Sequence, residues 1–133
     1  MKDGDRAGLS MLRDMSAWIG VARDGGNYRV VMHQNINMDR RWNTVIKGED
    51  AASVPAPKGK IWLRVAADIH PGADRTAVFS YSTNGKDFQP LGPPFPLNNR
   101  WQFFMGYRYA IFNYATTSLG GEVKVHSFTM TTP

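Results

Sequence analysis

Residues 61–72 read IWLRVAADIHPG, and this stretch decides the fold class. From Ile61 to Ile69 the odd positions carry Ile, Leu, Val, Ala and Ile, whereas the even positions carry Trp, Arg, Ala and Asp. A period of two places alternate side chains on opposite faces, as in a strand with one face in a core and the other in solvent. The His-Pro-Gly that follows is a strong turn signal. The stretch therefore predicts one half-buried strand of an antiparallel sheet.

Strand-like segments recur along the whole chain, with turn residues between them. The candidate strands are 6–13, 16–23, 28–33, 42–47, 61–69, 76–82, a short return strand beginning near Asp87, two strands in 101–112 that meet at a bend at Gly106, and 122–131. Residues 34–41, 48–59 and 113–121 are predicted to be loops. No helix is predicted, because no long stretch carries apolar residues at i, i+3 and i+4 without a Gly or Pro. Short strands at this spacing indicate an antiparallel sandwich or barrel, formed by residues 1–133 as one domain.

Two glycine-containing turns are expected to close hairpins. Asp24-Gly25-Gly26-Asn27 separates the second and third candidate strands. Asn84-Gly85 follows the strand at 76–82, and this dipeptide favours the two positive φ angles of a type I′ turn. A tight hairpin is therefore predicted at Asn84-Gly85.

Composition excludes several classes of protein. At 42% apolar residues the chain is too hydrophobic to be disordered, and with no cysteine it holds no disulfide, thiolate zinc site or cysteine nucleophile. The net charge is +5, but the basic residues stand among acids, as in Arg13-Asp14 and Arg23-Asp24, which argues against nucleic-acid binding. No segment has the apolar length of a membrane span, and the first residues, MKDGD, lack the features of a signal peptide. Secretion and a cytoplasmic location are both compatible with the sequence.

The residues that could carry catalysis form no complete site. A glycosidase needs two opposed carboxylates, whereas most acids here stand at strand ends or in turns. Asp68, on the polar side of its strand, is the best single candidate. His33, His70 and His126 are far apart and form no metal-binding motif. Neither a serine-nucleophile motif nor a nucleotide-binding glycine motif occurs. We therefore expect no catalytic residue, metal or cofactor in this chain.

Aromatic residues beside polar ones point instead to saccharide binding. Sugars stack their C–H faces on aromatic rings and pair their hydroxyls with Arg, Asp, Asn or Gln. The candidate residues are Trp42 (next to Asn43), Trp62 with Arg64, and Tyr107, Arg108 and Tyr109. Packing in a core is the alternative for each ring. The Tyr-Arg-Tyr run is the strongest candidate, because it follows the predicted bend at Gly106 and places a cation between two rings.

Five blocks of sequence together resemble a known family. They are GDRAGL (4–9), WIGV (18–21), KIWLR (60–64), FSYSTNGKDFQPLG (79–92) and GYRYAIFNYA (106–115). In this order and spacing they resemble the C-terminal domain of glycoside hydrolase family 43 β-xylosidases and arabinofuranosidases. The resemblance implies an all-β, concanavalin A-like jelly-roll sandwich, and it covers nearly the whole chain.

The resemblance also implies a role. In that family the catalytic carboxylates belong to a separate N-terminal propeller, and the sandwich packs on it and lends a side chain to the rim of the active-site pocket. By position this role falls to Arg108, with Tyr107 and Tyr109 beside it, although the family often has a smaller or apolar residue there. The expected function is that of a non-catalytic accessory domain that braces the propeller, binds xylan-type saccharides, or does both. The alternative is a free-standing lectin-like carbohydrate-binding protein.

One departure from the family suggests a further partner. The family domain carries additional strands on its N-terminal side, so this chain corresponds to a sandwich that lacks N-terminal strands. Missing strands leave a sheet edge or an inner face exposed, and such edges pair readily with another chain. We therefore expect a homodimer or strand exchange through the exposed strands.

Overall fold

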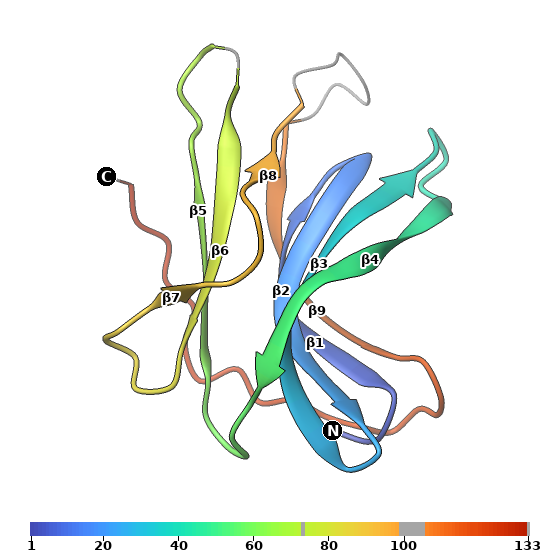
Figure 1. Ribbon diagram of the computed structural model, residues 1–133. Helices are drawn as coiled ribbons and strands as arrows, with labels where there is room; N and C mark the ends of the chain where they lie inside the picture. The colour runs from blue at the N-terminus through green and yellow to red at the C-terminus, as the bar shows by residue number, and fades with distance from the viewer. Residues whose placement is uncertain (73, 99–105, 133) are drawn as a thin grey trace.

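The computed structural model describes residues 1–72, 74–98 and 106–132. Two antiparallel sheets face each other (Figure 1), and the described residues form no helix, so the predicted β-sandwich is confirmed. The strands are β1 (Asp5–Leu12), β2 (Met15–Asp24), β3 (Asn27–Met38), β4 (Thr44–Pro55), β5 (Trp62–Ala67), β6 (Thr76–Ser82), β7 (Gln89–Pro90), β8 (Phe95–Pro96) and β9 (Arg108–Ala115). Within the described ranges there is no helix long and apolar enough to cross a membrane.

The strand order explains how distant parts of the chain meet. One sheet has five strands in the order β4-β3-β2-β1-β9, so the last strand pairs with the first. The other sheet has the order β5-β6-β7, with β8 also pairing with β6. Residues Asp24 to Asn27 form the turn between β2 and β3, where Gly25 and Gly26 have φ of 57° and 78°. Two successive positive φ angles match the twist of a hairpin, which confirms the predicted turn.

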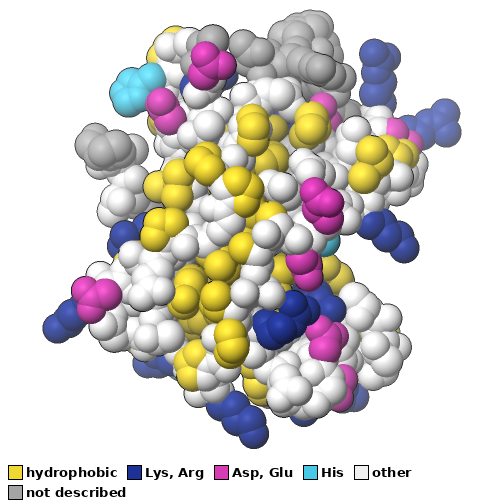
Figure 2. Space-filling view, viewed as in Figure 1, with side chains coloured by type: hydrophobic (Ala, Val, Ile, Leu, Met, Phe, Trp, Pro, Cys, Tyr) yellow, Lys and Arg dark blue, Asp and Glu magenta, His cyan; other side chains and the backbone are white. Residues whose placement is uncertain are grey.

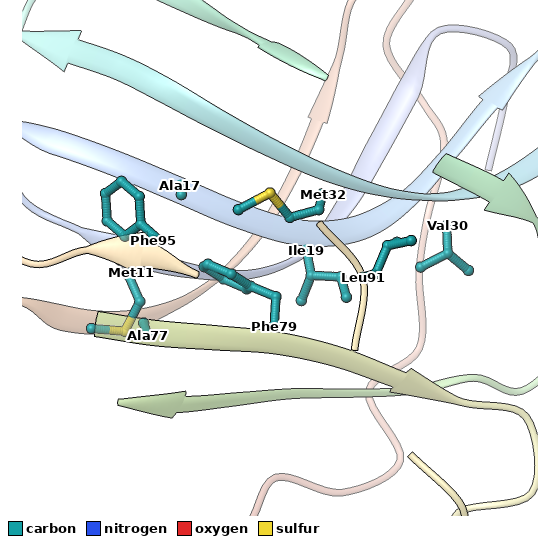
Figure 3. Packing of buried hydrophobic residues seen from close by; sticks show 9 residues of the cluster. All are labelled: Met11, Ala17, Ile19, Val30, Met32, Ala77, Phe79, Leu91 and Phe95. Carbon is teal, nitrogen blue, oxygen red and sulfur yellow. The ribbon is translucent and has the colours of Figure 1, made fainter. Parts of the chain in front are cut away.

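The core lies between the two sheets. Nine buried side chains meet there, as Figure 3 shows: Met11, Ala17, Ile19, Val30, Met32, Ala77, Phe79, Leu91 and Phe95. Burying each of the larger ones stabilises the fold by about 1.5–3 kcal/mol. Seen as in Figure 1, hydrophobic side chains also reach the surface along the seam between the sheets (Figure 2). The buried cluster therefore joins side chains of both sheets in one hydrophobic core.

The alternation in residues 61–69 has the predicted effect over most of its length. Leu63, Val65 and Ala67 pack against the core, whereas Arg64 is exposed. The strand nevertheless ends at Ala67, and Ile69, predicted to point inward, is exposed. The Asp68 carboxylate accepts a hydrogen bond from the backbone N–H of His70, which favours a turn there over a continued strand.

Two predicted loops, 34–41 and 48–59, are wrong over most of their length, because residues 34–38 and 48–55 are parts of long paired strands, whereas 39–41 and 56–59 are loops as predicted. Residues 34–38 extend β3 and residues 48–55 extend β4, and the two strands pair from Arg29 opposite Pro55 to Met38 opposite Thr44. β4 is an edge strand that is largely solvent-exposed, so it tolerates polar residues and a terminal proline. Asn35 and Gly48 both have positive φ, at 61° and 80°, and the ladder continues around them.

The tight hairpin predicted at Asn84-Gly85 is also wrong. β6 returns only at β7, with Tyr81 opposite Gln89, so residues 83–88 form a longer loop. Gly85 has positive φ but Asn84 does not. The Asn84 side-chain oxygen instead accepts hydrogen bonds from the backbone N–H groups of Lys86 and Asp87. Because this side chain accepts hydrogen bonds from the backbone N–H groups of the loop, the loop is stable without a type I′ turn.

The C-terminal third departs from expectation in two respects, and the first is that residues 113–115, predicted to begin a loop, continue β9 by pairing with β1. β9 runs from Arg108 to Ala115, as part of the predicted pair in 101–112, whose residues 101–105 lie outside the described ranges. Residues 122–131, predicted to form the last strand, form none. A strand exists only where a neighbour completes its hydrogen bonds, and no described strand pairs with this segment. Its apolar side chains are exposed: Val123, Val125, Phe128 and Met130.

Candidate functional site

The six candidate residues lie in three separate regions. Tyr107, Arg108 and Tyr109 are at the beginning of β9, on one edge of the five-stranded sheet. Trp62 and Arg64 are on β5 in the other sheet. Trp42 is in the turn between β3 and β4. The fold therefore gives three candidate surfaces instead of one continuous site.

At the beginning of β9, Tyr107 is anchored by its neighbours. Its ring meets Phe95 edge-on, with centroids 6.1 Å apart, and the Arg13 guanidinium lies 5.7 Å from the ring centre. The Asn98 side-chain amide donates to the Tyr107 hydroxyl at 3.3 Å. Burial raises the pKa of the Tyr107 hydroxyl. Tyr107 thus fixes the start of β9, from which Arg108 and Tyr109 reach solvent.

A buried polar group supports this anchor. Arg13 and Asp14 are both buried, and Arg13 Nη1 donates to the backbone and side-chain oxygens of Asn98 at 2.7 and 2.8 Å. Asn98 Nδ2 in turn donates to Asp14 Oδ1 at 3.3 Å. Buried charges are tolerated only with such partners. The group connects the β1–β2 turn to the chain before β9.

On β5, Trp62 and Arg64 alternate and so share the solvent-facing side of the strand. The Arg64 guanidinium lies 3.5 Å from the centre of the Phe88 ring. Gly85 lies against the Trp62 indole, where a Cβ would be 2.8 Å from the ring. The Arg64 guanidinium thus covers one face of Phe88, and the Trp62 indole lies beside Gly85, so an indole and a guanidinium, two groups that sugar recognition uses, occupy the same side of β5.

Trp42 is exposed in a tight turn, with φ of 64°. The Asp39 carboxylate closes the turn by accepting from the backbone N–H groups of Arg41 and Asn43. These bonds, first that from Asn43, lower the pKa of Asp39. The Asn43 side chain also donates to Asp39, so it is already engaged beside the indole.

Asp68 has the properties of a structural carboxylate. It is exposed, and hydrogen bonds from His70, first from its backbone N–H, lower the pKa of Asp68. A general acid needs the opposite shift, because it must keep its proton near neutral pH. Among residues 1–72, 74–98 and 106–132, no group of three His, Asp or Glu residues is placed to hold a metal ion.

A fourth cluster, absent from the sequence-based candidates, lies on the outer face of the five-stranded sheet. Trp18 stacks on His33 with ring centroids 5.0 Å apart, and Phe112 meets the same indole edge-on at 5.1 Å. Phe112 also lies 5.8 Å from the Tyr114 ring. His33 Nδ1 is 2.7 Å from Asp50 Oδ1, which continues the cluster onto β4. The pairing of β2 with β3 brings His33 to Trp18, and the pairing of β9 with β1 brings Phe112 to the same indole, so alternation within single strands could not reveal the cluster.

Comparison with known proteins identifies the family to which the chain belongs. The model of the β-xylosidase C-terminal concanavalin A-like domain matches residues 1–131, which confirms the predicted sandwich type. No curated protein sequence matches.

Solved structures agree with this match. An engineered family 43 glycoside hydrolase with endo-xylanase and exo-arabinofuranosidase activity is similar at a TM-score of 0.85 and 41% identity, over 91% of this chain and 25% of that chain. A bifunctional GH43-CE protein from Bacteroides eggerthii is similar at 0.78 and 29% identity, over 91% of this chain and 14% of that one. A GH43_12 protein from a capybara gut metagenome shares the fold at 0.61 and 21% identity, over 85% of this chain and 21% of that one. This chain thus spans about a quarter or less of each.

Proposed function

The chain belongs to the family of β-xylosidase C-terminal concanavalin A-like domains, and we propose that it acts as a non-catalytic accessory domain of a xylan-degrading glycoside hydrolase. The observation that carries the proposal is the fit of nearly the whole chain to one quarter of a family 43 enzyme, at 41% identity. A module that makes up a quarter of an enzyme performs its task beside the remaining part. We propose that this part is a catalytic propeller that supplies the catalytic carboxylates.

The bracing role would fall to the beginning of β9. Tyr107 is held by Phe95, Arg13 and Asn98, so the exposed side chains that follow it start from a fixed point. Arg108 would reach the rim of the propeller's active-site pocket, with Tyr109 beside it. A guanidinium suits this position, because it donates several hydrogen bonds in a fixed plane to sugar hydroxyls.

The saccharide-binding role would use stacking surfaces. Trp62 with Arg64 on β5, and Trp42 in its turn, present aromatic groups next to hydrogen-bonding groups. The ligand that fits the proposed enzyme is xylan or a xylo-oligosaccharide. We propose that the chain alone hydrolyses nothing, because Asp68 is exposed and its low pKa opposes proton donation.

The test of this function is a titration of the isolated chain with xylo-oligosaccharides, followed by tryptophan fluorescence, and a hydrolysis assay with and without a family 43 propeller. Saturable binding supports the binding role. Absence of binding together with a gain of hydrolysis when the chain is added to the propeller supports the bracing role. Hydrolysis of xylan by the chain alone would contradict the proposal, and so would the lack of both binding and gain.

A homodimer is the second part of the proposal. In the described part of the chain, nothing pairs with the edge of β5 that faces away from β6. Tyr109 and Ile111, on the side of β9 that faces the core, are 39% and 52% exposed. We propose that residues 122–131 of a second copy pair with β5 and cover these side chains. Sedimentation at high concentration tests the dimer, and a strictly monomeric mass would contradict it.

A further inference from the structure

The outer face of the five-stranded sheet has a floor of small residues. Gly8 and Ser10 of β1 lie opposite Gly20 and Trp18 of β2, and Ala22 follows on the same side. A Cβ on Gly8 would overlap the carbonyl oxygen of Ile19, and one on Gly20 would overlap that of Ala7. The two strands approach so closely that only glycine fits at either position. The middle of this face therefore combines small residues with the indole of Trp18, which is 5% exposed.

Aromatic side chains border the floor on the β9 side. Phe112 pairs with Gly8 and Tyr114 pairs with Arg6, and the two rings lie 5.8 Å apart at an angle of 33°. Tyr114 is 45% exposed. Phe112 rests on the buried Trp18, which fixes its position. Two neighbouring rings, one of them open to solvent, form a platform on which sugar rings could stack.

Paired charges border the floor at its end near the β2–β3 turn and toward β4. Arg6 contacts Asp24 at 3.0 Å, and Arg29 contacts Asp24 at 3.3 Å and Asp50 at 3.9 Å. Two guanidinium groups thus face two carboxylates, and their charges cancel. Such pairs offer donors and acceptors side by side, which suits hydroxyl groups of a neutral ligand better than a charged one.

Tyr114 and Asp50 belong to β9 and β4, the two edges of the sheet, so the side chains that border the face span its whole width. Burial raises the pKa of Tyr114, although the residue is still 45% exposed. An open pocket of about 440 Å³ adjoins the face at Arg29 and Ser53.

We propose that this outer face binds a neutral chain of β-linked pyranoses. The sugar rings stack on Tyr114 and Phe112, and their hydroxyls pair with the Arg6–Asp24 and His33–Asp50 groups. The proposal rests on the proposed function, and it adds this face to the stacking surfaces at Trp42 and Trp62. The cancelling charges and the exposed ring of Tyr114 favour a neutral ligand that stacks on an aromatic ring.

Calorimetric titration of the whole chain with xylohexaose tests the proposal. We expect Tyr114→Ala to weaken binding at least tenfold, because the exposed ring of the platform is lost, and Tyr114→Phe to retain it within about threefold. Asn113→Ala is the matched control, since Asn113 is exposed on the same strand but faces the other way, and its Kd should stay within twofold of the wild type. Equal melting temperatures of the three variants exclude loss of folding.

Several outcomes would overturn the inference. If the wild type binds xylohexaose and Tyr114→Ala binds it as tightly, the sugar does not bind at the outer face, and the proposed function still stands. If Tyr114→Ala only weakens the gain of hydrolysis with a propeller, without changing Kd, the face docks the propeller instead. If the wild type binds nothing and gives no gain with a propeller, the proposed function itself fails.

Discussion

His33 lies flat on the indole of Trp18, with ring centroids 5.0 Å apart and an interplanar angle of 16°. Its two ring nitrogens are 2.7 Å from Asp50 Oδ1 and 2.8 Å from the Lys47 carbonyl oxygen, so the imidazole is held from both sides. Trp18 is only 5% exposed although it is on the outer face of its sheet. His33 therefore covers the Trp18 indole and shields it from solvent.

Replacing this cover should destabilise the fold and expose the indole. We expect His33→Ala to lower the free energy of unfolding by about 1–3 kcal/mol, because it removes a ring stack and two polar contacts. The fluorescence of the folded variant should shift to longer wavelength as water reaches Trp18. Urea unfolding and emission spectra give both quantities. His33→Phe keeps the stack and should recover part of the loss; an unshifted spectrum for His33→Ala would mean that other side chains cover the indole.

The buried Arg13 should be far more costly to remove than an exposed arginine. Truncating one member of a buried charged group leaves its partners without compensation, and typically costs about 3–5 kcal/mol. We expect Arg13→Ala to fall in that range. Arg6→Ala, whose ion pair with Asp24 is partly exposed, should cost about 0–1 kcal/mol. Chemical denaturation of both variants makes the comparison, and equal losses would contradict the structural role assigned to Arg13.

How much of this could be predicted from sequence depends on whether a feature is local. The alternation around Leu63 and Val65 identified the inward face of β5, because burial acts on each strand separately. The turn at Gly25-Gly26 was likewise predictable from backbone chemistry.

The outer-face cluster could not be predicted in this way. Phe112 reaches Trp18 only because β9 pairs with β1, and no pattern within either strand states that register. For residues 122–131, the pattern within the segment predicted a strand that the structure does not contain. Their alternation is that of a strand, but a strand also needs a neighbour, and the sequence does not say whether one is present.

Alkaline pH should weaken the fold through two tyrosines. Burial raises the pKa of Tyr107 and Tyr114 in the folded state above the ordinary value of 10.0. Their hydroxyls therefore stay protonated in the folded state at a pH where the unfolded chain already loses those protons. Stability from this source is complete below about pH 10 and is lost as pH rises from there through the folded pKa values. Melting temperatures between pH 8 and 11 should fall less steeply for a Tyr107→Phe, Tyr114→Phe double variant, and parallel curves would refute the assignment.

Glycines should differ sharply in their tolerance of alanine. A Cβ on Gly20 would overlap the backbone of Ala7 in the neighbouring strand, which cannot move without breaking the sheet. We therefore expect Gly20→Ala to destabilise the fold by about 1–3 kcal/mol or more, as overpacking does. For Gly106, where a bend was predicted, no atom of the described residues lies within 4 Å of an added Cβ, and its φ is not positive, so Gly106→Ala should change stability by less than about 0.5 kcal/mol. Thermal and urea unfolding of the two variants, beside the wild type, measure the difference. A large loss for Gly106→Ala would show that the bend needs glycine, and a neutral Gly20→Ala would show that β1 and β2 can separate enough to admit a side chain on the floor of the outer face.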